Sequence, residues 1–239
     1  MVCSKKYEFG GVAVAIMAVV ALAGVTTSWS LAASPGQSPG EIANFGMMQH
    51  GTPPCASCHG VNGEGVRTQN GPRLAGLDAG YIERQLNAFG EGKRNSSVME
   101  RIARTLNDDQ RAALANYYAT LPAMTDARTP EKNVNAVALG QVIATQGNWP
   151  EKVPPCASCH AADGLGVGSI APALAGQHVD YLRRQLMRFR QSERRDDPLG
   201  LMRGISSRLS GREIEAVAAY YASRPSGPPE KPRPPGGRQ

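Results

Sequence analysis

An internal repeat constrains this chain more than any other feature of its sequence. The segment PPCASCH at residues 53–59 returns unchanged at residues 154–160. Further matched segments follow in the same order and at nearly the same spacing: PRLAG at 72–76 with PALAG at 172–176, RQL at 84–86 with 184–186, and YYA at 117–119 with 220–222. A sequence that carries one ordered set twice predicts two similar domains. We place them at residues 39–122 and 134–225, joined by a linker at residues 123–133.

Each repeat is expected to be helical. Ile82, Leu86 and Phe89 recur at the spacing of one helix face, as do their counterparts in the second repeat. Ser210 followed by Glu213 has the pattern of a capping box, and Asn107 followed by Gln110 is a looser version. Alternation typical of strands is absent from the sequence, so the fold class is all-α.

The two ends of the chain differ from its body. Lys5 and Lys6 precede an apolar run at residues 11–25 and a stretch of small residues, the pattern of an export signal. Residues 1–32 are therefore a signal peptide, or alternatively a membrane anchor, since the run is short for a span of about 20 residues. Residues 226–239 are rich in proline and are expected to form a disordered tail. Export places the body of the chain in the periplasm, soluble or anchored to the inner membrane, and excludes nucleic acid as a partner.

Each repeat contains Cys-x-x-Cys-His, the pattern of covalent attachment of c-type haem. Two thiols one helical turn apart can add to the two vinyl groups of one porphyrin, and the adjacent histidine can then bind the iron. A thioredoxin-like pair would need a βαβ context, and zinc would need two pairs that converge. We therefore expect two covalently attached haem c groups. The haem-binding residues are Cys55, Cys58, His59, Cys156, Cys159 and His160.

A second iron ligand must come from elsewhere in each repeat. Histidine and methionine are the usual candidates. Met99 and Met202 occupy equivalent places in the two repeats, about forty residues after the motif histidines, and we predict that they bind the irons. A ligating histidine also needs an acceptor for its other ring nitrogen. Backbone carbonyls in the loops at Pro72 and Pro172 are placed to provide it.

These motifs together resemble class I cytochromes c, and the duplicated form resembles the dihaem cytochrome c4 family. The resemblance spans both repeats. It implies two tandem class I cytochrome c domains, each wrapped around one covalently bound haem with histidine and methionine ligands. It also implies outer-sphere electron transfer in the periplasm.

Three functions remain open on this basis. The first is an electron carrier between a donor dehydrogenase or quinol-oxidising complex and a terminal acceptor such as an oxidase. The second is a haem c subunit of a membrane-bound respiratory dehydrogenase or oxidase, held by residues 11–25. The third, a dihaem peroxidase, is disfavoured because it needs one open iron. The expected partners are thus redox proteins. An arginine-rich stretch at residues 183–195 is either a docking patch for an acidic partner or a solvated helix face with arginines near haem propionates.

Overall fold

The computed structural model describes residues 37–123, which we call the first half, and residues 134–227, which we call the second half. The predicted signal peptide or anchor, most of the predicted linker and nearly all of the predicted tail lie outside these residues. Among the described residues there is no strand, only isolated bridges between single residues, so the prediction of an all-α fold is confirmed. No helix among them is long and apolar enough to cross a membrane.

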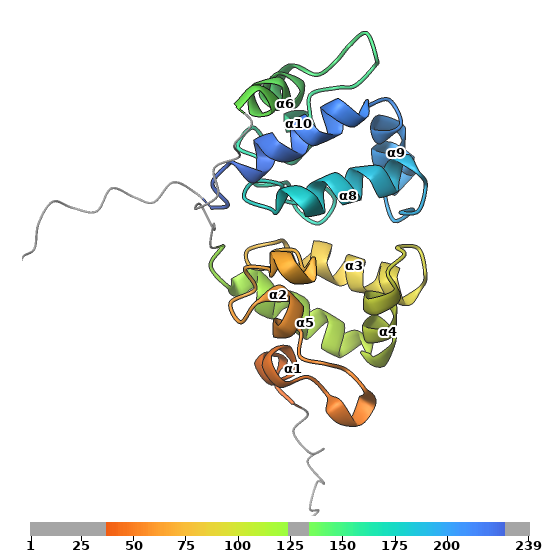
Figure 1. Cartoon of the computed structure of the whole chain (residues 1–239). Helices are drawn as coiled ribbons and strands as arrows, with labels where there is room; N and C mark the ends of the chain where they lie inside the picture. Colours follow the sequence, from red (N-terminus) through yellow and green to blue (C-terminus); the bar gives the residue numbers. More distant parts are fainter. Residues whose placement is uncertain (1–36, 124–133, 228–239) are drawn as a thin grey trace, which may run out of the picture. The chain divides into compact units, whose positions relative to one another are not determined.

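The first half contains five α-helices, which Figure 1 shows in red to green. They are α1 (Pro39–Phe45), α2 (Ala56–His59), α3 (Ala79–Gly90), α4 (Ser97–Thr105) and α5 (Asp108–Thr120), with short 3-10 turns at Met48–His50 and Arg67–Gln69. Helix α3 packs against α4 and α5, and α1 packs against α5. Asn107 and Gln110 form the predicted capping box at the start of α5.

The second half repeats this order. Its helices are α6 (Val134–Gln146), α7 (Ala157–His160), α8 (Val179–Arg190), α9 (Leu201–Ser206) and α10 (Gly211–Ala222), with a 3-10 turn at Pro198–Gly200 before α9. Ser210 and Glu213 form the capping box of α10. Helix α10 packs against α6 and α8. The first contact is very close, because a Cβ atom at Gly140 would collide with the carbonyl of Ala216.

Each half has its own core, made by the apolar faces that the sequence predicts. Ile82 and Phe89 of α3 are buried, as are Leu182 and Phe189 of α8, while Leu86 and Leu186 are partly buried. Tyrosine pairs pack edge to face at the ends of α5 and α10, with ring centroids 5.2 and 5.1 Å apart.

Candidate haem sites

The Cys-x-x-Cys-His motif forms one helical turn in each half. In the first half the backbone amides of Cys58 and His59 both donate to the carbonyl of Cys55, at 3.1 and 2.9 Å. Cys159 and His160 make the same bonds to Cys156, at 3.2 and 3.0 Å. All four cysteines are free thiols. The turn therefore presents two unbridged thiols beside one imidazole, as thioether attachment of a porphyrin requires.

Both motif histidines are held by the proline loops. His59 is buried and its Nδ1 lies 2.9 Å from the carbonyl oxygen of Pro72. His160 is buried in the same way, with Nδ1 2.8 Å from the carbonyl oxygen of Pro172. With Nδ1 donating to a carbonyl, Nε2 carries the lone pair that a metal needs. Burial lowers the pKa of both histidines, against the smaller effect of the carbonyl bonds, so the imidazoles are neutral.

The loop that carries Pro72 packs directly on the motif. A Cβ atom at Gly71 would collide with the carbonyl oxygen of Cys58. Only glycine therefore allows the proline loop to approach the turn this closely. The second half has Ala171 at the equivalent position, where the backbone forms a bridge with Val167.

Burial also acts on the thiols. It raises the pKa of Cys55, and it raises the pKa of Cys156 to about 11. Because the thiolate is the reactive form of cysteine, these two side chains are weak nucleophiles in the chain alone.

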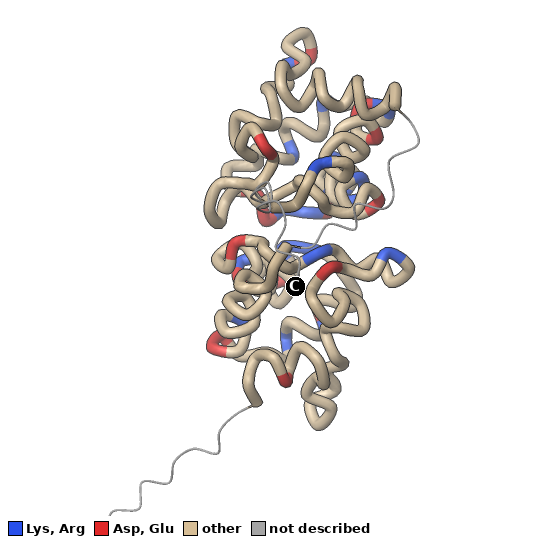
Figure 2. The backbone as a smooth tube through the Cα atoms, turned by 90° about the vertical axis from the view of Figure 1, so that its left-hand side faces the viewer, with Lys and Arg blue, Asp and Glu red and all other residues tan. Residues whose placement is uncertain are grey.

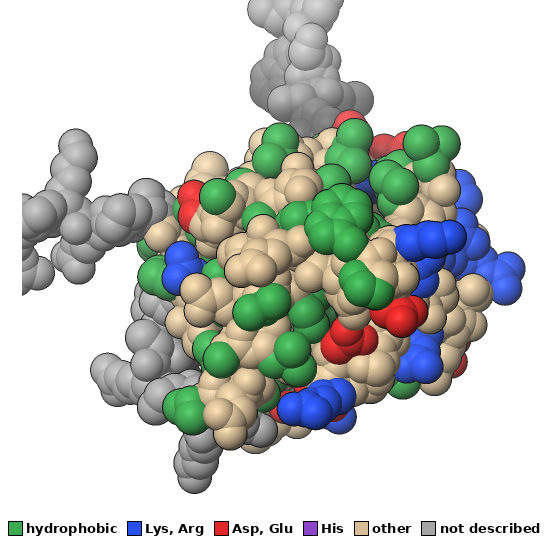
Figure 3. Space-filling view, turned by 90° about the horizontal axis from the view of Figure 1, so that it is seen from above, with side chains coloured by type: hydrophobic (Ala, Val, Ile, Leu, Met, Phe, Trp, Pro, Cys, Tyr) green, Lys and Arg blue, Asp and Glu red, His purple; other side chains and the backbone are tan. Residues whose placement is uncertain are grey.

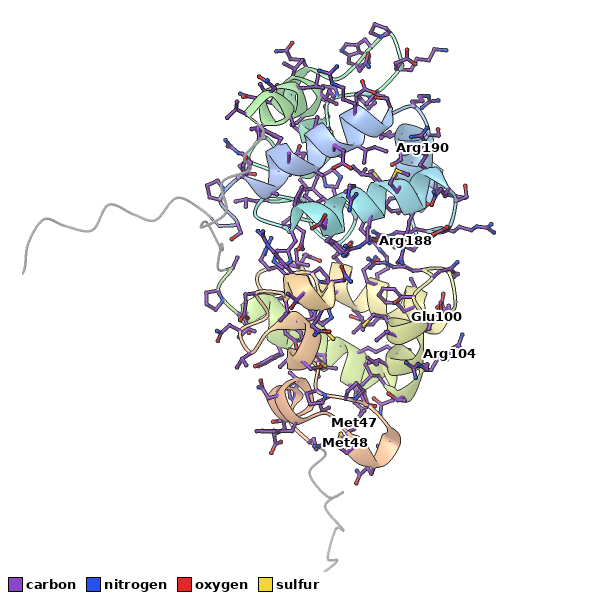
Figure 4. The ribbon with its side chains drawn as sticks, viewed as in Figure 1. Met47, Met48, Glu100, Arg104, Arg188 and Arg190 are labelled. Atoms are coloured by element: carbon purple, nitrogen blue, oxygen red, sulfur yellow. The ribbon has the colours of Figure 1, made fainter. Side chains whose placement is uncertain are left out.

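The predicted second ligands lie on equivalent helices. Met99 is in the first turn of α4, where Ser96 caps the helix by accepting from the Met99 amide. Met202 is in the first turn of α9. Met47 and Met48, labelled in Figure 4, lie in the loop after α1 instead, with Met47 buried and Met48 exposed.

An open cavity lies between the methionine helix and the segment that leads into the first motif. It has a volume of about 500 Å³. Its lining residues come from the loop after α1 and from α4: Met48, His50, Gly51, Pro53, Val98, Arg101, Ile102 and Thr105. This lining is largely apolar and adjoins both Cys55 and Met99 in sequence. None of the predicted haem-binding residues lines the cavity, so the fit to haem c rests on the donor set of thiols, imidazole and thioether in each half.

Between the halves lies a group of buried and partly buried polar residues, which we call the inter-half cluster. Its members are Tyr81, Gln85, Arg94, Tyr181, Gln185, Arg194 and Asp196. The two arginines also stack on phenylalanines, with Arg94 4.5 Å from the Phe89 ring centroid and Arg194 4.4 Å from that of Phe189. Blue segments at the meeting of the halves in Figure 2 mark basic positions of this kind.

The arginines of the arginine-rich stretch make several different contacts in the described structure. Arg184 donates to the carbonyl of Asn70 at 3.3 Å and Arg188 to that of Asn95 at 3.0 Å, so both reach the first half. Arg194 belongs to the inter-half cluster, while Arg183 pairs with Asp180 on the exposed surface at 3.1 Å. Figure 4 shows Arg188 and Arg190 on different sides of α8. Arg184, Arg188 and Arg194 of this stretch therefore contact the first half.

From the sequence, Arg194 is considered only as part of the arginine-rich stretch, and no role is predicted for the other members of the inter-half cluster or for Arg73. The repeat alignment carried a signal for the cluster, since tyrosine, glutamine and arginine recur at equivalent positions. It carried none for Arg73, because the second repeat has Ala173 there.

Comparison with known proteins agrees with this architecture. The cytochrome c family model matches residues 52–122 and 137–224. The thiosulfate dehydrogenase electron acceptor of Stutzerimonas stutzeri (strain A1501) is 40% identical over 71% of this chain and 78% of its own length. Cytochrome c4 of Thiocapsa roseopersicina is 38% identical over 70% of this chain and 84% of its own.

A solved structure of thiosulfate dehydrogenase from Marichromatium purpuratum is also similar. It superposes with a TM-score of 0.73 at 37% identity, covering 79% of this chain but only 40% of the longer chain.

Fold, repeated site and comparisons together define a c-type cytochrome with two haem domains. The chain belongs to the cytochrome c family, in its two-domain cytochrome c4 form, as the sequence predicts. Each half binds one covalently attached haem c, and the protein transfers electrons.

Proposed function

We propose that the protein carries single electrons in the periplasm from a donor dehydrogenase to a terminal acceptor, and is not itself an enzyme. The observation that carries the proposal is the equivalence of the two sites. Each has a buried histidine whose Nδ1 bonds to a proline carbonyl, and each has a methionine at the same place in the repeat. In this proposal the two predicted methionine ligands leave neither iron open to a substrate.

In this proposal the residues act as the sequence predicts. Cys55 and Cys58 attach one haem, and Cys156 and Cys159 attach the other. His59 and Met99 bind the first iron, and His160 and Met202 bind the second. Each haem supplies an iron that changes between the ferric and ferrous states. Pro72 and Pro172 hold the histidines in one tautomer and orientation, so the ligand set stays fixed while the charge on iron changes.

Exposed apolar residues lie close in the sequence to the residues of each proposed site, and we call them the apolar rim. In the first half Met48 and Val98 are exposed and line the cavity. In the second half Trp149, Leu199 and Leu201 are exposed beside the motif and Met202. Exposed apolar groups that lie together mark sites of contact with other proteins. In Figure 3 hydrophobic side chains interrupt the polar surface of the face seen from above.

Leu199 gives a specific reason to assign contact to the rim. Its side chain is 97% exposed, and its backbone is left-handed, with φ at 56°. A non-glycine residue in this region costs free energy, and an exposed leucine returns none of it through burial. Leu199 therefore does not stabilise the fold through burial, and its exposed side chain is suited to contact with another molecule.

The donor we propose is a thiosulfate dehydrogenase. Two relatives carry the name thiosulfate dehydrogenase electron acceptor, from Stutzerimonas stutzeri at 40% identity and from Thiomonas intermedia at 36%. The similar part of the Marichromatium purpuratum chain belongs to a protein titled thiosulfate dehydrogenase. These names support a donor of this kind, and they also keep open the second function, a haem subunit within a larger complex.

A stopped-flow experiment tests the proposal. The oxidised protein is mixed with a thiosulfate dehydrogenase and thiosulfate, and haem reduction is followed by absorbance. We expect both haems to be reduced only when enzyme and thiosulfate are both present. Reduction by thiosulfate alone, or catalytic consumption of added peroxide by the purified protein, would contradict the carrier role.

The N-terminus of the mature protein distinguishes the two candidate functions, a free electron carrier and a subunit of a membrane-bound complex. A processed product that lacks residues 1–32 favours the carrier. Retention of these residues favours the membrane-bound complex.

A further inference from the structure

Arg73 is a fully buried cation at the place where the halves meet. Its side chain has no exposure to solvent. The guanidinium donates to the carbonyl of Ala75 in its own half and, at 3.0 Å, to the carbonyl of Ala175 in the other. Ala75 and Ala175 are equivalent residues of the repeat, so the charge lies between equivalent points of the two halves.

No side-chain carboxylate of the described residues forms an ion pair with Arg73. Its Nε has no hydrogen-bond partner among residues 37–123 and 134–227. Burial lowers the pKa of Arg73 to about 10, with no opposing carboxylate. The guanidinium is therefore still charged at neutral pH.

The second half holds the arginine by a dedicated residue. The side chain of Gln177 accepts from the Arg73 amide and donates to the Arg73 carbonyl, both at 2.9 Å. In the alignment of the two repeats, Ala173 is equivalent to Arg73 and Leu77 is equivalent to Gln177. The Arg73–Gln177 pair therefore occurs once in the chain, so one cation of this kind, not two, lies between the halves.

The cation is connected to both proposed haem sites. Arg73 directly follows Pro72, whose carbonyl binds His59. Ala175 lies three residues after Pro172, whose carbonyl binds His160. Reduction of a haem adds one negative charge, and a fixed cation in a medium of low dielectric constant favours the reduced state.

We propose that Arg73 sets the working potential of this protein by raising the reduction potentials of both haems. It acts through its charge and touches neither iron ligand. The proposal rests on the presence of haem in both halves, and it does not depend on which proteins donate or accept electrons.

Spectroelectrochemical titration of the full holoprotein tests this proposal, after mass spectrometry has shown that each variant carries two haems. Arg73→Gln and Arg73→Met remove the charge, and Arg73→Lys keeps it. At the wild-type midpoints we expect the ratio of reduced to oxidised haem to fall about three- to tenfold in both halves of the neutral variants. The lysine variant should stay near the wild type.

Gln177→Met provides the matched control, because it removes the two bonds that hold the Arg73 backbone but leaves the charge. We expect it to lower stability without the change in potential. Unchanged midpoints in the neutral variants would overturn the proposal, as would an equal change in Gln177→Met. If Arg73→Met does not fold, Arg73→Gln gives the same comparison, because its amide can still donate to one carbonyl.

Discussion

Arg94 and Arg194, equivalent residues of the repeat, share the glutamines of both halves. Arg94 donates to Gln85 at 2.7 Å and to Gln185 at 2.9 Å, and Arg194 donates to Gln185 at 3.0 Å and to Gln85 at 2.8 Å. Two buried cations thus lie together, and in the described structure only Asp196 of this cluster brings a carboxylate, 2.8 Å from Arg194. The contact between the two halves is polar, specific and nearly symmetric.

Replacement of Asp196 by asparagine should destabilise the fold. The Arg194–Asp196 pair is almost fully buried, and removing one partner leaves the other charge uncompensated. Such changes cost about 3–5 kcal/mol. Chemical denaturation of the holoprotein measures the loss. Asp180→Asn, which breaks an exposed pair with Arg183, is the matched control and should change the unfolding free energy much less. Equal effects of the two substitutions would contradict this interpretation of the cluster.

The same carboxylate should make stability depend on pH in the acid range. Burial acts to raise the pKa of Asp196, but the hydrogen bond and charge of Arg194 outweigh it, so the pKa is lowered on folding. Because the pKa of Asp196 is lower in the folded state, its ionised carboxylate stabilises the fold fully above the pKa of the unfolded chain, about 3.9. This stabilisation is lost as the pH falls through the folded-state pKa. Unfolding free energies measured from pH 7 downward should therefore fall less steeply below pH 4 in Asp196→Asn than in the wild type. Parallel curves would show that Asp196 does not titrate in this way.

Exchange of each proposed methionine ligand should affect one haem only. Histidine in place of Met99 or Met202 replaces a thioether by an imidazole, which lowers the reduction potential. We expect one midpoint to fall, the other to remain close to its original value, and half of the methionine–iron charge-transfer absorbance of the ferric protein to disappear. Met48→Leu, at a methionine without a counterpart in the repeat, should change neither property. Retention of the full absorbance after either histidine exchange would refute the ligand assignment.

The apolar rim should control the rate of electron exchange and not the potential. Leu199→Asn removes the exposed side chain and places a residue that tolerates the left-handed backbone at this position. We expect slower reduction by the donor enzyme, an unchanged midpoint and slightly higher stability. Val134→Ser, at another exposed apolar side chain, is the control. If both variants react at the same rate as the wild type, the rim around Leu199 is not the contact surface.

The sequence allowed prediction of what each half does by itself. Helix faces such as Ile82 and Phe89, the capping boxes of α5 and α10, and the motif turns depend on residues close together in the chain or repeated in it. These patterns follow from helical periodicity and from the repeat. The hydrogen bonds from His59 and His160 to the proline carbonyls are also present where the proline loops indicated.

The contacts between the two halves could not be predicted in the same way. Arg184 and Arg188 belong to a helix whose pattern alone resembles a solvated face, yet they reach the carbonyls of Asn70 and Asn95. Arg73 looks like an ordinary loop residue until Gln177 and Ala175 are brought against it. These contacts depend on how two separately folded units pack together, and one sequence carries little information about that.

The intact mass of the purified protein under denaturing conditions tests the central claim most directly. Thioether-linked haem survives denaturation, so the wild type should exceed the mass of its polypeptide by two haem groups. Variants with both motif cysteines of one half replaced, Cys55 with Cys58 or Cys156 with Cys159, should each exceed it by one. A wild-type protein that carries a single covalent haem or none would contradict the account.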